Sequence, residues 1–331
     1  MFMLIPPKYI LTPKIAEYLQ IIESCKAVID SVPIPKEVEM NIRRKSSLKS
    51  SLFSARIEGN TLTLEDLPRA SSKDQKKVEV FNILKAINLI YQRGISRDLS
   101  LKDILHLHKL TMEKLISGED LGSFRTQVSA IYNSSGIAIY LPPRPSSLSS
   151  LMNKLITFLN SSRENFIPIR ACLVHYIFEK IHPFLDGNGR VGRLLTQAVL
   201  AKNGYGMKGL LPLEEYLDDH RSEYYQALEA PEKEVSDYLE FMLEAIAKTA
   251  LFAKDEVLSK KQMDVVDLLL PRRAEIVNII RDHRLVNFDI LRRRFLMVSG
   301  RTLRYDLKKL ADDGLIRKRG TTKGAYYEPI E

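Results

Sequence analysis

The sequence has 331 residues, of which 45% are hydrophobic and 27% charged, and a formal net charge of +9. These values exclude a disordered or fibrous chain and predict a globular protein with room for two or more domains. No run reaches the roughly 18 apolar residues that a membrane span needs, and the opening MFMLIPPKYILTP lacks the basic start of a secretory signal. Because only Cys25 and Cys172 are present, far apart, we expect reduced thiols in a cytoplasmic protein.

For residues 1–95 the sequence predicts N-terminal helices preceded by an irregular segment. Apolar residues at helical spacing mark one of these helices: Phe81, Leu84, Ala86, Ile87, Ile90 and Tyr91. Earlier, Ser54 to Asn60 reads SARIEGN, in which a helix would end at Glu58 before Gly59. Farther on, His106 and His108 are two residues apart on an expected helix, which points them to different faces and argues against a metal pair.

Two short β-prone runs follow Gly122, Phe124 and Arg125. The first run consists of Val128, Ser129, Ala130, Ile131 and Tyr132, and the second extends from Ile137 to Leu141 before two prolines. The NSSG turn between the runs predicts a β-hairpin. Taken alone, this pattern fits an ordinary hairpin without a ligand.

Two apolar stripes flank the segment HPFLDGNGRVGR at residues 182–193. The first predicts an amphipathic helix and consists of Ile169, Cys172, Leu173, Tyr176, Ile177 and Ile181. Pro183 disfavours helical geometry at His182, so the chain should turn there. The second stripe consists of Val191, Leu194, Leu195, Ala198 and Val199, and Asn203 and Gly204 provide its C-terminal stop.

The residues between these helices suit a nucleotide triphosphate beside a reacting hydroxyl. The start of the second helix is formed by Gly187, Asn188 and Gly189, where free N–H groups and the positive helix dipole favour phosphate oxygens. Arg190 and Arg193 are expected on one side of that helix, gripping the outer phosphates. Asp186 can bind Mg²⁺ together with phosphate oxygens, and His182, with an ordinary pKa of about 6.5, can take the hydroxyl proton.

The last 61 residues carry most of the net positive charge, +7 of the total +9, with 15 Lys and Arg against 8 Asp and Glu from residue 271 onward. Helices are expected over 273–282, 288–295 and 299–313, with Leu303, Leu307 and Leu310 inward. The run LIRKR, the turn GTTKG and AYYEP then predict a two-stranded wing. This pattern resembles a winged helix-turn-helix domain. The residues expected to meet DNA are Arg301, Arg304, Lys308, Arg317, Lys318, Arg319 and Lys323.

The segment HPFLDGNGRVGR resembles the full signature of the Fic family, HxFx(D/E)GNGRxxR, with every defining position filled. The resemblance implies a mainly α fold, a Fic helical bundle with a small β-hairpin flap, that transfers AMP from ATP to a protein Ser, Thr or Tyr hydroxyl. By position, His182 is the base, Asp186 the magnesium ligand, residues 187–189 the anion hole, and Arg190 and Arg193 the phosphate grips.

Two further segments gain a role from this resemblance. The hairpin 128–141 resembles the Fic flap, whose strand edge holds a target segment by backbone pairing. The segment SARIEGN resembles the inhibitory pattern (S/T)xxxE(G/N), so that Ser54 and Glu58 would pair with Arg193 and block the γ-phosphate. Keeping such a gate closed in about 99 of 100 molecules needs about 2.7 kcal/mol. A largely buried pair supplies this, since breaking one costs about 3 to 5 kcal/mol.

The sequence thus predicts an N-terminal helical region with the inhibitory motif (1–95), a Fic catalytic core (96–255) and a winged helix-turn-helix domain (265–331). An autoinhibited protein adenylyltransferase that uses ATP and Mg²⁺ is the favoured function. The alternative is a DNA-binding transcriptional regulator in which the Fic body is a sensor or removes AMP. A target protein, DNA and a second copy of the chain are the candidate partners, and the winged helix could instead contact protein.

Overall fold

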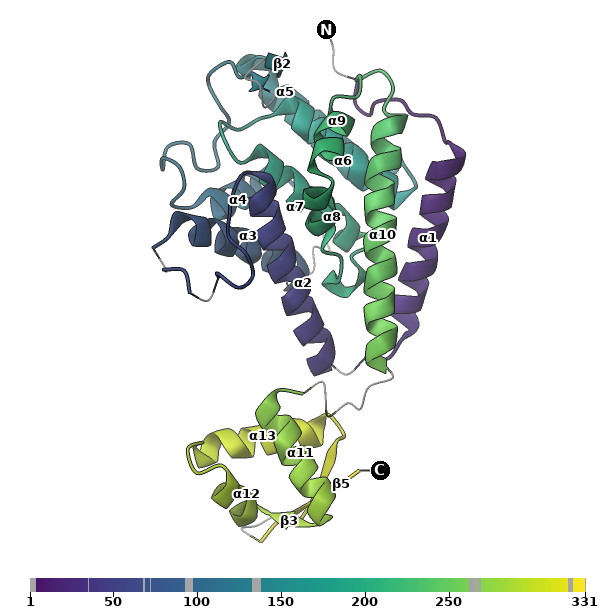
Figure 1. The fold of residues 1–331 in the computed structure, drawn as a ribbon. Helices are drawn as coiled ribbons and strands as arrows, with labels where there is room; N and C mark the ends of the chain where they lie inside the picture. Colours follow the sequence, from purple (N-terminus) through teal and green to yellow (C-terminus); the bar gives the residue numbers. More distant parts are fainter. Residues whose placement is uncertain are drawn as a thin grey trace. The chain divides into compact units, whose positions relative to one another are not determined.

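The computed structural model describes residues 4–34, 36–67, 69–71, 73–92, 98–132, 138–261, 266, 269–320 and 324–330. The chain divides into two compact units (Figure 1). The first consists of residues 1–31 and 42–255, and the second of residues 32–41 and 256–331. Each unit is described below by itself.

Helices are the dominant secondary structure of the chain up to residue 261, as the mainly α prediction requires. In chain order the elements are α1 (Pro13–Ser31), α2 (Lys36–Ile57), α3 (Gln75–Gln92), α4 (Leu101–Met112), β1 (Ile131–Tyr132), β2 (Ala138–Tyr140), α5 (Pro145–Leu159), α6 (Ile167–Ile181), α7 (Asn188–Lys202), the 3₁₀ turn η1 (Met207–Gly209), α8 (Leu213–Asp219), α9 (Arg221–Leu228) and α10 (Ser236–Lys261). The fold class predicted from the sequence is confirmed.

Helices α6 and α7 form the centre of the first unit (Figure 1). They pack on each other, and α5 covers α6 while α3 and α4 cover α7. Both predicted stripes are buried, but the expectation that α6 is amphipathic is wrong: from Pro168 to Ile181 every residue of α6 except Glu179 is buried. A helix that is enclosed on all sides buries its polar residues as well, and these need partners. The polar groups of α6 and α7 are therefore where the site should be sought.

Local chemistry fixes where several helices begin and end. Helix α4 starts at a capping box, in which Ser100 Oγ accepts from Asp103 N and the Asp103 carboxylate accepts from Ser100 N. Helix α7 follows Gly187, whose φ of 84° lies in the left-handed region that glycine tolerates. A Cβ at this glycine would lie 2.6 Å from Sδ of Met112, so the turn also depends on a close approach to α4.

The predicted hairpin is present but shorter than expected. Strand β1 contains only Ile131 and Tyr132, and its register against β2 is interrupted by an irregularity between these residues. Val128, Ser129 and Ala130 are not in a strand, and Val128 is 74% exposed. The NSSG turn lies outside the described residues. Within the described part of the chain β1 and β2 pair only with each other, so each strand keeps one edge free of other strands.

Besides the start of α2 and the end of α10, the described part of the second unit consists of α11 (Pro271–His283), β3 (Val286–Asn287), α12 (Phe288–Arg294), α13 (Gly300–Asp312), β4 (Ile316–Arg319) and β5 (Tyr326–Pro329), with strand order β3-β5-β4. The predicted inward residues Leu303, Leu307 and Leu310 are buried in its core. The helices and the two wing strands agree with the prediction, whereas β3 was not foreseen. Buried Asp306 binds Arg272 and Arg273, which fixes α11 on α13.

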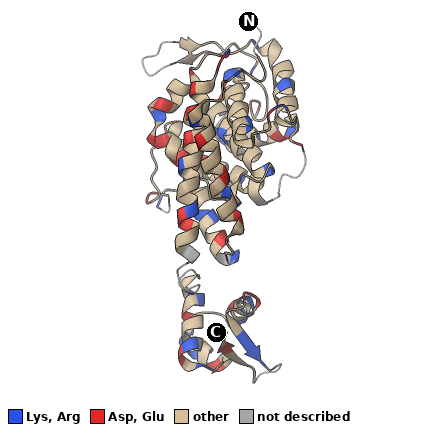
Figure 2. Cartoon of the chain, turned by 90° about the vertical axis from the view of Figure 1, so that its right-hand side faces the viewer, with Lys and Arg blue, Asp and Glu red and all other residues tan. Residues whose placement is uncertain are grey.

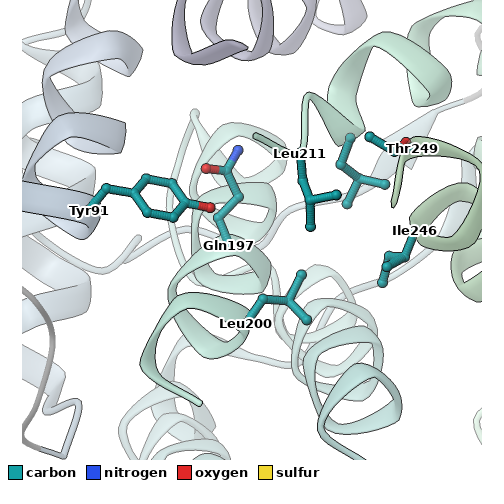
Figure 3. Close-up of a pocket in the computed structure, with 7 residues that line it drawn as sticks. Tyr91, Gln197, Leu200, Leu211, Ile246 and Thr249 are labelled. Atoms are coloured by element: carbon teal, nitrogen blue, oxygen red, sulfur yellow. The ribbon is translucent and has the colours of Figure 1, made fainter. Parts of the chain in front are cut away.

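No described helix is long and apolar enough to cross a membrane. Both cysteines are buried free thiols whose pKa burial raises. Figure 3 shows a small cavity beside α7, lined by Tyr91, Gln197, Leu200, Leu211, Leu213, Ile246 and Thr249. Its volume of about 10 Å³ is close to the smallest space that holds one water molecule. This cavity cannot accept a nucleotide.

Candidate active site

His182 stands at the end of the central helix α6, as Pro183 predicts. Its backbone lies in the left-handed region with φ 49° and ψ 59°, and its N–H donates to Phe178 O at 2.9 Å. Non-glycine residues in this conformation are uncommon and are often held at functional sites. Here the carbonyl of His182 accepts a 2.8 Å bond from Nε of Arg125, which helps to hold the turn.

The imidazole of His182 is kept neutral. Burial lowers its pKa to about 4, and the charge of Arg125 acts in the same direction, while the Glu179 carbonyl and the carboxylates of Glu58 and Asp186 oppose the shift. At neutral pH the ring is therefore unprotonated. A neutral imidazole can accept a proton, so the group is suited to act as a base.

The side chains of Asn188 and His108 hold the loop between α6 and α7 in a way that the sequence did not predict. The amide of Asn188 brackets Phe184, accepting from its N–H and donating to its carbonyl at 2.9 Å each. His108 accepts from Gly122 N at 2.9 Å through Nδ1, so its Nε2 carries the hydrogen and donates to Asp186 O at 3.0 Å. The His108 ring also stacks on Phe184 with centroids 3.8 Å apart.

These contacts revise two expectations. The side chain of Asn188 is 2% exposed and locks the loop, so only its backbone can belong to an anion hole. His108 positions the loop through its contacts with Gly122, Asp186 and Phe184, a role that the sequence did not predict. The local sequence contains no signal for this role, because His108 and Asp186 are 78 positions apart.

The first turn of α7 lies against a carboxylate. A Cβ placed on Gly189 would collide with Oε1 of Glu58, so glycine is required for this close approach. The carboxylate therefore occupies the region where unpaired N–H groups and the helix dipole favour an anion. This is the region to which the sequence assigned the phosphates.

The predicted contact between Glu58 and Arg193 is present. Nη2 of Arg193 donates to Oε1 of Glu58 at 2.8 Å and to Ser54 O at 2.9 Å, and its Nε donates to Ser54 Oγ at 3.0 Å. Burial by itself would lower the pKa of Arg193, but Glu58 raises it. The pair is less enclosed than expected, because the Arg193 side chain is 2% exposed and that of Glu58 is 26% exposed.

Arg190 does not accompany Arg193, contrary to the prediction that both project to one side. Its Nη1 donates to Oε1 of Glu79 on α3 at 2.5 Å, and its Nη2 donates to Oδ1 of Asp186 at 2.6 Å. Residues three apart on a helix differ by one-sixth of a turn. Despite this small difference, their long side chains reach different carboxylates, that of Glu58 just after α2 and that of Glu79 on α3.

Asp186 is the residue to which a divalent metal was assigned. Its side chain is 55% exposed, and its Oδ1 accepts from Arg190 and from Gly187 N. One accessible carboxylate beside a phosphate site fits Mg²⁺, which prefers one or two carboxylates together with phosphate and water oxygens.

One cleft brings Glu58, His182, Gly189 and Arg193 together, whereas Asp186, Gly187, Asn188 and Arg190 do not line it. It is lined by Glu58, Glu179, Lys180, His182, Gly189 and Arg193, by Ile131, Ile139 and Tyr140 of the hairpin, and by Arg221, Ser222, Tyr224, Tyr225, Gln226, Leu228 and Glu229 around α9. Glu179 was not predicted. Burial raises its pKa to about 8, an effect that Glu58 reinforces and Arg193 opposes, and its buried Oε1 has no hydrogen-bond partner among the described residues.

The residues assigned to DNA lie in the second unit, apart from this cleft in the sequence. Arg301, Arg304 and Lys308 are exposed on α13, and Lys318 is exposed on β4, which is blue in Figure 2. The Arg304 guanidinium lies over the Phe288 ring, 4.3 Å from its centroid. Arg317 and Arg319 both pair with Glu328 on β5, which reduces their availability. Lys323 lies outside the described residues.

Residues 98–200 match the model of the Fic/DOC family. Among curated relatives, a protein named protein adenylyltransferase Fic from Drosophila grimshawi is 31% identical over 230 residues, which are 64% of this chain and 44% of the relative. A protein of the same name from Aedes aegypti is 29% identical over 66% of this chain and 45% of its own length. The chain thus spans less than half the length of these relatives.

Solved structures show the same fold. A Fic family protein from Desulfovibrio desulfuricans matches 98% of both chains with a TM-score of 0.67 and 24% identity. Fic-1 from Caenorhabditis elegans matches 74% of this chain and 72% of its own, with a TM-score of 0.59 and 19% identity.

Proposed function

We propose that this chain, which matches the Fic/DOC family model over residues 98–200, is a protein adenylyltransferase, which transfers AMP from ATP to the hydroxyl of a Ser, Thr or Tyr in a target protein. The observation that supports this function best is the cleft in which a neutral imidazole lies near the start of a helix and a buried arginine. The relatives that bear the name of this activity support the same conclusion.

The proposed reaction needs one base and an anion site. The hydroxyl oxygen of the target attacks the α-phosphorus of ATP, and its proton passes to the imidazole of His182. The bond from this phosphorus to the bridging oxygen breaks, and pyrophosphate leaves with that electron pair. The N–H groups at Gly187, Asn188 and Gly189 and the guanidinium groups of Arg190 and Arg193 would stabilise the charge on the phosphates.

Asp186 would hold the metal, and the hairpin would hold the target. Asp186 would bind Mg²⁺, which, when present, neutralises phosphate charge. The free edge of the hairpin, with Ile131 and Tyr132 preceded by Val128, Ser129 and Ala130, would pair with a target segment. We place these residues in a core of 96–255, preceded by the helical region 1–95 and followed by the domain 265–331, in a cytoplasmic protein.

Glu58 would inhibit the reaction. Its carboxylate lies over Gly189 and holds Arg193, so that the γ-phosphate would compete with a charge of the same sign for one guanidinium. Ser54 would keep Arg193 in this orientation through Nε. An equilibrium between the paired and released states would set the basal rate.

A direct test uses ATP labelled in its α-phosphate, with Mg²⁺ and an extract of cellular proteins. Label should become covalently attached to protein with Glu58→Gly and not with the double variant Glu58→Gly, His182→Ala. Absence of label with both variants, while ATP still binds, would contradict the proposed activity.

DNA binding by the second unit is the second candidate function. It is favoured by α13, which begins at a capping Ser299, buries one leucine face and exposes Arg301, Arg304 and Lys308. Such binding should weaken steeply with salt, because the contacts release counterions. A fluorescent duplex whose anisotropy does not change at low salt would reject it.

A further inference from the structure

Arg125 contacts the backbone on both sides of the cleft. Its Nε donates to His182 O at 2.8 Å, its Nη1 to Gln127 O at 2.9 Å and its Nη2 to Pro143 O at 2.6 Å. Its own N–H donates to Pro183 O at 2.9 Å. The residue is 4% exposed, and its described side-chain acceptors are all carbonyl oxygens. Arg125 is thus a buried cation that binds backbone rather than a carboxylate.

The two ends of the hairpin and the catalytic turn meet at this one side chain. Gln127 precedes β1 and Pro143 follows β2, so Nη1 and Nη2 of Arg125 join the segments that enter and leave the hairpin. His182 has the left-handed backbone described above, and such a conformation persists where its surroundings fix it. One guanidinium therefore links the support of the hairpin to the backbone that carries the imidazole.

Only arginine has the geometry for these contacts. The guanidinium presents five N–H donors in a rigid planar fork, whereas the lysine ammonium has three donors on a flexible stem. Burial also lowers the pKa of Arg125, which is a cost of placing the charge here. The guanidinium is buried at this cost and joins four carbonyl oxygens, those of Gln127, Pro143, Ile181 and His182, which indicates that it fixes the position of these segments.

We propose that Arg125 is a positioning residue that fixes the hairpin relative to the imidazole of His182, and thereby the place of the incoming hydroxyl. The inference rests on the proposed adenylyl transfer. Arg125 touches neither reacting group. Its loss should impair the alignment of a protein hydroxyl, while ATP binding and attack by water, which do not use the hairpin, should change little. A misplacement of about 1 Å can reduce a rate by about 100-fold.

The experiment compares Arg125→Lys with a matched control, both in the Glu58→Gly background. The control is Arg170→Lys, because Arg170 is also a buried arginine, 9% exposed, whose Nε and Nη2 bind a carbonyl, that of Glu164, at the opposite end of α6. Arg125→Gln is the second variant, since it removes the buried charge and folds without its cost. The assay separates protein-bound label from free AMP, and the affinity for α,β-methylene-ATP is measured in parallel.

We expect both Arg125 variants to lose about 10- to 100-fold in protein-bound label, with free AMP and nucleotide affinity within about threefold of the parent and of the Arg170 control. Equal labelling by parent and Arg125 variants would overturn the inference, and so would a parallel loss of nucleotide affinity. Amide hydrogen exchange at 126–132 and 138–141 should accelerate in Arg125→Lys but not in Arg170→Lys. Because exchange needs no activity, it tests the positioning role even if the parent transfers no AMP.

Discussion

Oε1 of Glu58 lies 2.8 Å from Nη2 of Arg193, joining the end of α2 to the first turns of α7 across 135 positions of the sequence. The same carboxylate packs on Gly189. One side chain therefore occupies the start of the helix and binds the arginine behind it. Its release would free both groups at once, which makes the contact a suitable gate.

Glu58→Gly should raise AMP transfer by roughly 5- to 150-fold, which corresponds to about 1 to 3 kcal/mol of coupling. The range lies between the values for exposed and buried pairs because Glu58 is one-quarter exposed whereas Arg193 is buried. The initial rate of protein labelling measures it. Glu215→Gln is the matched control, since Glu215 also pairs with α2, through Lys49 at 2.9 Å, but does not line the cleft. A similar gain in both variants would assign the effect to α2 rather than to the gate.

His182→Ala in the Glu58→Gly background should reduce transfer by about 10² to 10⁴. In the parent, kcat/KM should rise with pH through about 4 and then level off, because burial lowers the pKa of His182 to about 4 and the base must be unprotonated. Initial rates between pH 4 and 8 test this expectation. An acidic limb near 6.5 would mean that the working imidazole is solvated, contrary to the burial described.

Glu179→Gln should stabilise the fold increasingly as the pH rises. Burial raises the pKa of Glu179 from 4.5 to about 8, so its contribution is fully present below pH 4.5 and is lost as the pH rises through 8. The glutamine has no proton to lose, and the difference in unfolding free energy should grow by up to about 1.4 kcal/mol per pH unit in this window. Urea unfolding at pH 5 and pH 8 measures it, and equal differences at both values would show that Glu179 is ionised normally.

Local patterns in the sequence predicted elements that have one buried face. The α13 leucines are one example, since Leu303, Leu307 and Leu310 form a single stripe that packs on the core of the second unit. Helix α6 does not follow this rule. Its periodicity predicts an amphipathic helix, but neighbours cover it on all sides, and periodicity carries no information about what surrounds a helix. The two-residue strand β3 is too short to produce a pattern.

The sequence predicted the site residues that lie together in one segment. It did not predict the residues whose role depends on contacts between distant parts of the chain. His182 and the loop to Arg193 lie within one segment, and their placement at two helix ends follows from Pro183 and the glycines. The supporting contacts of Arg125 and His108 join residues 57 and 78 positions apart. Neither residue has a local signal for its partner, because a buried side chain selects its acceptors only after the helices have packed.

Asp186→Asn should raise the Mg²⁺ concentration needed for half-maximal transfer by at least about 10- to 100-fold, since a metal ligand should matter no less than an outer-shell partner. The asparagine keeps an oxygen that can accept from Gly187 N and Arg190, so the loop should persist, and loss of the partly exposed ion pair should cost at most about 1 kcal/mol. Glu79→Gln separates the two functions of the carboxylate. Like Asp186→Asn, this variant removes a carboxylate that pairs with Arg190, here at 2.5 Å. Glu79, however, lies on α3 and not in the loop that would hold the metal. If Mg²⁺ dependence shifts equally in both variants, the arginine rather than the metal accounts for the effect, and Asp186 is not a ligand.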